Sequence, residues 1–542
     1  MKTMLLSSLA KVFPDEEPKN PVISSFSMLK NEKKSFQLAF CAEEDKTVEV
    51  KINSPLEKAV SAFRIGFVPS KLPKYKDSDD FYLRDGRPGL YPDILYPLEA
   101  EGMRLQAKKG EWQSLWFELA PADSFAAGDY SVEIILDDDV KENVNIKILG
   151  LSLPEQELIC TMWFHTDCLM TWYGFEAFSE EYWRTVENFA ECAVEHGINF
   201  LLTPLFTPPL DTEVGGERPT VQLVDVNKDG ENYTFGFEKL ERWVDMCDRA
   251  GIKYFEMSHL FSQWGAVAAP KIMATENGEH KMIFGWDTEA AGEEYTAFLT
   301  QFAAALIKFI DAKGIRERCV FHASDEPNLF FFASYEHAVK LVNSLFGDFK
   351  IIDALSDFRF YEEGLVKTPI PSNDRIEAFI GRVPELWTYY CCGQHKGYVS
   401  NRFFAIPSQR NRVLGWQMYK YGLSGFLQWG FNFWYAQLSK RPVNPFEESD
   451  AGEAFPSGCA YVTYPGEGGR PLVSLRLKVF YDALQDMRAL KLLERKIGKD
   501  AVVEIIENNT AKPITFSEYP HEEEWIINKR EEINRILGGE KQ

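Results

Sequence analysis

The chain has 542 residues, more than one ordinary hydrophobic core accommodates, so we expect at least two domains. Its formal charge of −23 comes from 59 Lys and Arg against 82 Asp and Glu, and the acidic residues are spread along the chain. Such a surface repels phosphate backbones and anionic membranes, which argues against nucleic acid as a partner. No apolar run approaches the roughly 18 residues of a membrane span, so we expect no membrane insertion.

The cysteines and the first residues bear on the compartment. The nine cysteines are odd in number and lack C-x-x-C spacing, although Cys391 and Cys392 are adjacent, and this usage favours a reducing compartment. Residues 1–6 resemble the start of a signal sequence, but Ser7, Ser8 and Lys11 interrupt the apolar stretch. We therefore expect a cytoplasmic protein without a cleaved signal.

Residues 1–153 are predicted to form a β-sandwich domain. Short segments alternate between apolar and polar residues with period two and are separated by turn residues, which is typical of strands in a sandwich. These segments are residues 35–40, 48–52, 130–136 and 144–148. Leu151 to Pro154 is the expected linker.

Residues 154–498 alternate between predicted strands and helices, which indicates a parallel sheet. The predicted strands are 159–165, 198–203, 252–258, 318–323, 349–353, 376–380, 386–391 and 424–429. Eight such strands predict a (β/α)8 barrel of the TIM type, although 372–391 can also be divided differently. The predicted helices are 180–196, 237–250, 290–313, 335–346 and 407–421, and glycines suited to a left-handed C-cap follow the first three.

The C-terminal part is predicted to be helical. Residues 472–497 form a long amphipathic helix expected to pack on the barrel, and 499–542 form an acidic helical tail. The predicted fold class is thus a multidomain α and β protein: a β-sandwich, a (β/α)8 barrel and a C-terminal helical extension.

The tetrapeptide Ser-Asp-Glu-Pro at 324–327 places Asp325 and Glu326 directly after the predicted strand 318–323. Pro327 ends the strand because it has no N–H to donate. In a parallel barrel this is the C-terminal mouth, where catalytic groups are carried. Read alone, the tetrapeptide also fits a turn in which Asp325 caps the backbone and Glu326 is solvated.

Adjacency limits what the two carboxylates can do. Ordinary retaining glycosidases hold their carboxyl groups about 5–5.5 Å apart on opposite sides of the scissile bond, and neighbouring residues on one strand point to opposite faces. Adjacent acids suit substrate-assisted chemistry instead, in which a 2-acetamido oxygen attacks the anomeric carbon. Glu326 would then protonate the leaving oxygen while Asp325 orients the acetamido group.

Other polar and aromatic residues follow the predicted strands. We assign them to substrate binding: His165, Asp167, Thr203, His259, Gln263, Trp264, Tyr389, Tyr390, Trp429, Asn432 and Trp434. Aromatic faces stack on sugars, although the 14% aromatic content by itself is as well explained by large cores. Which of the two tyrosines faces the site stays open. His322 and Trp416 are expected in the core, and without H-E-x-x-H or C-x-x-C spacing we expect no metal and no cofactor.

Several motifs in combination make the chain resemble glycoside hydrolase family 123, the β-N-acetylgalactosaminidases. They are F-H-A-S-D-E-P at 321–327, L-T-P-L-F-T-P-P at 202–209, S-H-L-F-S-Q-W-G at 258–265 and G-F-L-Q-W at 425–429. The resemblance implies a carbohydrate substrate with terminal β-linked N-acetylgalactosamine, released by an exo-acting enzyme with retention through an oxazoline. It also implies that Asp325 polarises the acetamido group and that Glu326 is general acid, then general base.

Two alternatives stay open at this point. One is a barrel glycosidase of other specificity, with Glu326 as acid and Glu256 as a conventional nucleophile or base. The other is a carbohydrate-binding protein that kept the pocket and lost catalysis, against which the intact pair of acids argues. The sequence alone gives neither the aglycone nor the oligomeric state.

Overall fold

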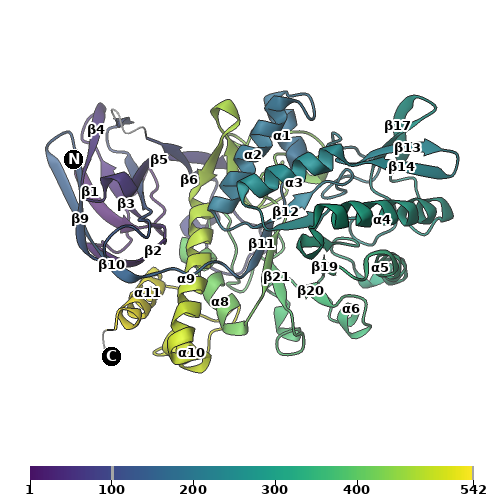
Figure 1. Ribbon diagram of the computed structural model, residues 1–542. Helices are drawn as coiled ribbons and strands as arrows, with labels where there is room; N and C mark the ends of the chain where they lie inside the picture. Colours follow the sequence, from purple (N-terminus) through teal and green to yellow (C-terminus); the bar gives the residue numbers. More distant parts are fainter. Residues whose placement is uncertain (99–102, 540–542) are drawn as a thin grey trace.

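The computed structural model describes residues 1–98 and 103–539, and its four sheets lie mostly in two parts of the chain. Figure 1 shows the N-terminal strands at one end of the molecule, a ring of parallel strands with surrounding helices at the other, and the long helix α9 (Leu475–Ile497) between them. The structure is therefore a mixed α and β protein with more than one structural unit.

Two sheets make up the N-terminal part. A seven-stranded sheet has the order β1-β3-β8-β5-β6-β24-β23, and a five-stranded sheet has the order β2-β10-β9-β4-β7. The strands are β1 (Lys2–Ser7), β2 (Ser25–Lys30), β3 (Lys34–Cys41), β4 (Lys46–Asn53), β5 (Val60–Ser70), β6 (Gly89–Pro97), β7 (Arg104–Ala107), β8 (Trp112–Leu119), β9 (Gly128–Leu136), β10 (Val140–Ser152), β23 (Thr463–Pro465) and β24 (Pro471–Ser474). Their alternate apolar residues, such as Phe36 and Phe117 from one sheet and Ile134 and Ile146 from the other, share one buried core.

The larger part contains eight parallel strands. They are β11 (Ile159–Met162), β12 (Phe200–Thr203), β15 (Tyr254–Met257), β18 (Cys319–Phe321), β19 (Lys350–Ala354), β20 (Thr368–Ile370), β21 (Trp387–Tyr389) and β22 (Gly425–Gln428). Their order is β20-β19-β18-β15-β12-β11-β22-β21, and every adjoining pair is parallel. Just beyond β20, the Tyr389 N–H donates to the Pro371 carbonyl at 3.2 Å, so the barrel is nearly closed.

The predicted sixth strand was wrong. Residues 376–378 form a short 3-10 helix, and the sixth strand is β20, whose centre is Pro369. Because proline cannot donate to a ladder, a segment containing one reads as a strand breaker. Here the strand is only three residues long and at the seam of the barrel, where a missing donor is tolerated.

Helices surround the barrel. They are α1 (Thr166–Tyr173), α2 (Glu180–Glu195), α3 (Glu238–Ala250), α4 (Glu293–Lys313), α5 (Phe332–Phe346), α6 (Arg359–Glu362), α7 (Ser408–Arg412) and α8 (Leu414–Tyr421). The predicted helices are present with small shifts at their ends, except that 407–421 is divided into α7 and α8, while α1 and α6 were not predicted. Gly251 and Gly314 adopt the left-handed conformation at the ends of α3 and α4. A separate sheet of β13 (Asp225–Asp229), β14 (Asn232–Gly236), β16 (Ile272–Glu276) and β17 (Glu279–Phe284) projects from the barrel.

The segment after the barrel connects the parts. After the barrel, β23 and β24 extend the N-terminal seven-stranded sheet, and α9 follows directly. Helices α10 (Lys499–Glu507) and α11 (Glu523–Leu537) complete the chain, and α11 lies against β2. Within the described residues, no helix combines the length and the apolar character that crossing a bilayer requires.

Candidate active site

A pocket of about 230 Å³ opens at the C-terminal end of the barrel strands. Asp325 and Glu326 follow β18, Tyr389 ends β21, and His165 and Trp429 follow β11 and β22. The remaining lining residues are Trp163, Leu210, Asp211, Gln263, Trp264, Ala354, Cys391, Cys392, Leu427, Gln437 and Phe455. The pocket therefore combines carboxylates with aromatic walls, which is the composition expected of a small-molecule site.

The peptide that carries the two acids is held from both sides. The Glu326 N–H donates to the Ala354 carbonyl at the end of β19 at 3.0 Å, and the Trp264 N–H donates to the Asp325 carbonyl at 2.7 Å. Glu326 has a φ of 42°, in the left-handed region that a residue with a side chain adopts only at a cost. Flanking hydrogen bonds thus fix an unfavourable backbone that directs both carboxyl groups into one pocket.

Burial dominates the electrostatics of the pair. It raises the pKa of Asp325 well above its ordinary value, and the neighbouring Glu326 charge raises it further. Burial likewise raises the pKa of Glu326, opposed by the Tyr389 hydroxyl, which donates to Glu326 Oε1 at 2.5 Å. Two adjacent buried carboxyl groups cannot both ionise easily, so the doubly charged state of the pair is disfavoured.

Below the pocket, His322 lies between two buried carboxylates. Its Nε2 is 2.8 Å from Glu256 Oε1, and its Nδ1 is 3.4 Å from Asp353 Oδ1. Burial alone would lower the pKa of His322, but the hydrogen bonds and charges of Asp353 and Glu256 outweigh it and raise the pKa to about 9. The imidazolium is therefore a core residue, as expected, and its positive charge favours ionisation of Asp325 above it.

The Glu256 carboxylate is hydrogen-bonded to three protein side chains. Besides His322, it accepts hydrogen bonds from Trp163 Nε1 at 2.8 Å and Thr161 Oγ1 at 2.5 Å, and it has no exposed surface. It does not line the pocket. A carboxylate committed to three donors in the barrel interior is poorly placed to attack an anomeric carbon in the pocket.

His165 is a pocket residue whose protonation is fixed. Its Nδ1 accepts from Arg218 Nη2 at 3.0 Å, and its Nε2 is 2.9 Å from the Trp429 carbonyl, so Nε2 carries the proton. Burial and the Arg218 charge lower its pKa to about 3. Asp167 lies behind it and holds Arg218 through two hydrogen bonds, at 2.9 and 2.7 Å. Asp167 thus supports the pocket wall and does not line it.

Of the other predicted binding residues, Gln263, Trp264, Tyr389 and Trp429 line the pocket. Tyr389 faces inward, while Tyr390 points to the opposite side, where its hydroxyl donates to Asn411 Oδ1 at 3.1 Å. The alternation of side chains along a strand explains this choice, since adjacent residues face opposite sides.

The structure does not bring Thr203, His259, Asn432 or Trp434 to the pocket. Thr203 accepts from Trp243 Nε1 on the outer side of the barrel, and His259 stacks on His322 with 4.3 Å between ring centroids. Asn432 binds the backbone of His165 with both ends of its amide. The Trp434 indole donates to the Thr463 carbonyl. These residues lie at or after the ends of barrel strands, as predicted, but their polar atoms form hydrogen bonds with other protein groups or are buried.

Asp211 is a third carboxylate of the pocket that sequence reasoning missed. Its Oδ2 accepts from the Leu438 N–H at 3.0 Å, and its carbonyl accepts from the Ser439 hydroxyl at 2.7 Å, which ties the loop after β12 to the loop after β22. Burial raises its pKa to about 6. The sequence signal for Asp211 was its place two residues after the Pro208-Pro209 turn. Gln437 is a second lining residue that was missed, because no periodicity marks the loop that carries it.

A parallel barrel with paired, buried carboxyl groups at its C-terminal mouth defines a barrel enzyme of the glycosidase class. The sequence profile described as "Glycoside hydrolase 123, catalytic domain" matches residues 163–493, which is more than half of the chain. The protein belongs to glycoside hydrolase family 123, and the resemblance noted from its motifs is confirmed.

One solved structure shares the fold over nearly the whole chain. A family 123 glycoside hydrolase from Clostridium perfringens, studied for glycolipid glycan hydrolysis, is similar with a TM-score of 0.75 and 13% identity, over 99% of this chain and 98% of that one. A xyloglucanase from Bacteroides ovatus matches over 85% of this chain and 98% of that one, with a TM-score of 0.31 and 9% identity. No curated protein matches the sequence.

Proposed function

We propose that the protein is a retaining, exo-acting glycoside hydrolase that releases terminal β-linked N-acetylgalactosamine by substrate-assisted catalysis. The observation that carries this proposal is the convergence of the adjacent Asp325 and Glu326 on one pocket that Glu256 does not line. Two acids on one side of a sugar can serve a proton donor and an acetamido ligand, whereas a conventional pair must flank the scissile bond.

In the first step, Glu326 gives its proton to the glycosidic oxygen while the acetamido carbonyl oxygen of the substrate attacks C1. The C1–O bond to the leaving group breaks, and the positive charge that develops on the acetamido nitrogen is met by the Asp325 carboxylate. The Glu326 carboxylate then takes a proton from water, whose oxygen attacks C1 and opens the oxazoline. Two inversions at C1 restore the β configuration.

Burial favours the proton on Glu326 that the mechanism requires, but it also opposes the charge on Asp325. Glu326 must be protonated for the first step, and burial raises its pKa. Asp325 must be ionised, and the His322 imidazolium below it favours this state. Burial raises the pKa of Asp325 as well, so the proposal assigns the retained proton to Glu326 on mechanistic grounds.

The choice of sugar rests on the family and on the 2-acetamido group that the mechanism requires. The Clostridium perfringens relative acts on glycolipid glycans, and we propose a glycan ending in β-N-acetylgalactosamine as the substrate here. A carbohydrate-binding protein without activity is disfavoured because a site that only binds gains nothing from two buried carboxyl groups on a strained backbone.

The test is hydrolysis of the p-nitrophenyl β-glycosides of N-acetylgalactosamine and N-acetylglucosamine, measured side by side. NMR identifies which anomer of the sugar is released first. We expect preferential turnover of the galacto substrate and release of the β anomer. Glu326→Gln should lose about 10²–10⁴-fold in kcat/KM on poorly activated aglycones. Glu336→Gln, which changes a partly exposed carboxylate on α5 that pairs with Lys340, is the matched control. Release of the α anomer would rule the proposal out, as would a wild-type kcat/KM of Glu326→Gln on a poorly activated aglycone such as a methyl glycoside.

A further inference from the structure

We infer that the exposed rings of Trp264 and Phe330 form a platform for the sugar residue on the leaving-group side of the scissile bond. This inference deepens the proposed function and rests on it. Trp264 and Phe330 are called the aglycone platform below.

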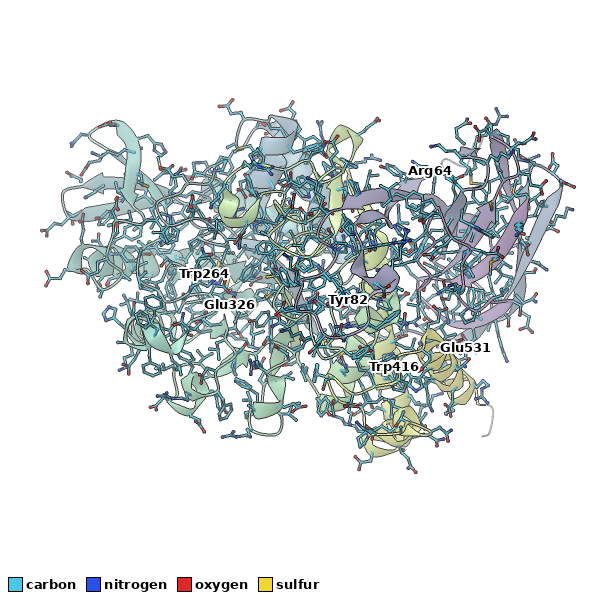
Figure 2. All side chains as sticks on the ribbon, turned by 180° about the vertical axis from the view of Figure 1, so that it is seen from behind. Arg64, Tyr82, Trp264, Glu326, Trp416 and Glu531 are labelled. Carbon is cyan, nitrogen blue, oxygen red and sulfur yellow. The ribbon has the colours of Figure 1, made fainter. Side chains whose placement is uncertain are left out.

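The general acid fixes where the leaving group lies. Glu326 must contact the glycosidic oxygen, so the aglycone leaves the pocket on the side of its carboxyl group. Phe330 follows Glu326 by four residues, on the 3-10 helix Leu329–Phe331. Trp264 lines the pocket, and its backbone N–H donates to the Asp325 carbonyl. Figure 2 shows the Trp264 and Glu326 labels next to each other in the barrel part.

The two platform segments are packed together. The Asn328 side-chain amide donates to the Trp264 carbonyl at 3.4 Å. A Cβ on Gly265 would lie 2.6 Å from Phe331, so glycine allows the closest approach of the two segments. Phe331 is thereby anchored inward, while Phe330 makes an edge contact with it at 4.9 Å and faces outward.

Exposure marks these rings as unusual. Phe330 is 88% exposed and Trp264 is 38% exposed, and Leu329 and Val267 beside them are 39% and 44% exposed. Trp264 also has a φ of 63°, an unfavourable backbone for a residue with a side chain. These exposed apolar side chains lie on the loops after β15 and β18, and one of them, Trp264, lines the pocket, which indicates a binding surface.

The pocket size explains why a second contact is needed. Its volume of about 230 Å³ lies below the ~300–1,000 Å³ of pockets that enclose drug-sized ligands. It can hold one sugar ring, and the next residue of a glycan must lie outside. The aglycone platform is suited to this contact, because Trp264 lines the pocket and Phe330 follows Glu326 by four residues.

A sugar fits this surface better than a lipid bilayer. Aromatic faces stack on the C–H face of a pyranose. The chain carries a formal charge of −23, which opposes approach to anionic membrane surfaces. The occupant we propose is therefore the pyranose ring of a glycan that follows the terminal residue.

The experiment compares two substrates that differ only in the aglycone: methyl β-N-acetylgalactosaminide and the disaccharide in which a methyl β-galactoside replaces the methyl group. The ratio of their kcat/KM values is measured for the wild type, Phe330→Ala and Trp264→Ala. We expect the preference for the disaccharide to fall by about five- to tenfold in each variant. Trp172→Ala, which removes a tryptophan equally exposed at 38% but outside the pocket, should leave the ratio unchanged.

A second readout does not depend on activity. Saturation-transfer NMR with methyl β-galactoside should show contact with the wild type and with Trp172→Ala, and a loss of contact in both platform variants. If the disaccharide preference and the NMR signal are the same in the wild type and all three variants, the inferred aglycone platform is wrong, while the proposed hydrolase function is unaffected. If no β-N-acetylgalactosaminide is hydrolysed, the proposed function fails, and the NMR signal alone decides the platform.

The lipid alternative has its own outcome. Co-sedimentation with phosphatidylcholine vesicles is measured for the wild type and Phe330→Ala. Binding that Phe330→Ala abolishes would overturn the sugar platform in favour of a membrane contact. Absence of binding in both proteins supports a sugar.

Discussion

Glu326 is subject to two opposed influences on its carboxyl group. Burial raises its pKa, while the Tyr389 hydroxyl, 2.5 Å from Oε1, stabilises the ionised form and lowers it. The balance sets the highest pH at which the residue can still donate a proton.

Tyr389→Phe removes the lowering influence, so the pKa of Glu326 should rise. The alkaline limb of the kcat/KM profile, where the acid loses its proton, should move to higher pH, with a lower rate at the optimum. Tyr390→Phe is the control, because its hydroxyl contacts Asn411 on the other side of β21. A limb that moves to lower pH in Tyr389→Phe would contradict the assignment of Glu326 as the acid.

Asp211 is expected to lower the stability of the folded protein, because its carboxylate is buried in the pocket. Burial raises its pKa to about 6, above the ordinary value near 3.8, so the folded state opposes its ionisation. Its cost is absent below about pH 4 and fully present above about pH 6. Asp211→Asn should therefore be more stable by about 1–3 kcal/mol at pH 7, with no gain at pH 4.

Denaturant unfolding at the two pH values measures this difference. The exposed Asp129→Asn serves as the control. An Asp211→Asn variant that is less stable at pH 7 would show that the link to Leu438 outweighs the cost of the buried charge.

Among the elements, the helix α8 lies against α9 at Gly415. A Cβ there would lie 1.9 Å from the Ala483 carbonyl oxygen, which belongs to the backbone and cannot rotate away. Gly415→Ala should force the helices apart and destabilise the protein by about 1–3 kcal/mol. Gly150→Ala in β10, where the nearest atom is the Ala127 Cβ at 3.8 Å, is the control. Equal melting temperatures for the two variants would contradict the tight contact.

The barrel was largely predictable because its strands are short apolar runs between helices with clear 3.6-residue periodicity. Six of the eight strands lie within the predicted ranges, and β19 extends one residue beyond its predicted end. The sixth strand, β20, was missed because Pro369 breaks the strand pattern. The site was predictable only in part. Strand ends indicate which residues come near the mouth, but they do not indicate rotation, so Tyr389 and Tyr390 could not be distinguished. Asp211 and Gln437 enter through long loops whose course depends on tertiary contacts.

At the scale of the whole molecule, buried ion pairs join parts that are distant in sequence. Asp486 on α9 binds Arg412 on α7 and Arg530 on α11, and Arg530 also binds Glu32 near β2. Asp93 on β6 similarly binds Arg476 at the start of α9. The division into 1–153, 154–498 and 499–542 stays a prediction, and these contacts indicate that the parts stabilise one another.

Asp486→Ala should destabilise the protein by about 3–5 kcal/mol, because two buried guanidinium groups would lose their partner. The Glu157→Ala control removes a partly exposed partner of Lys491 and Arg495 and should cost about 0–1 kcal/mol. Thermal unfolding followed by calorimetry provides both values. A small change in Asp486→Ala would mean that the tail is not needed to hold the parts together.

Inhibition by the thiazoline analogue of N-acetylgalactosamine tests the central claim most directly, since this compound mimics the oxazoline that the substrate itself would form. Hydrolysis of a β-N-acetylgalactosaminide by the wild type should be inhibited competitively, and Asp325→Asn, which lacks the charge beside the thiazoline nitrogen, should bind the inhibitor more weakly. Turnover that continues unaffected at saturating thiazoline would contradict a substrate-assisted mechanism and indicate a protein nucleophile.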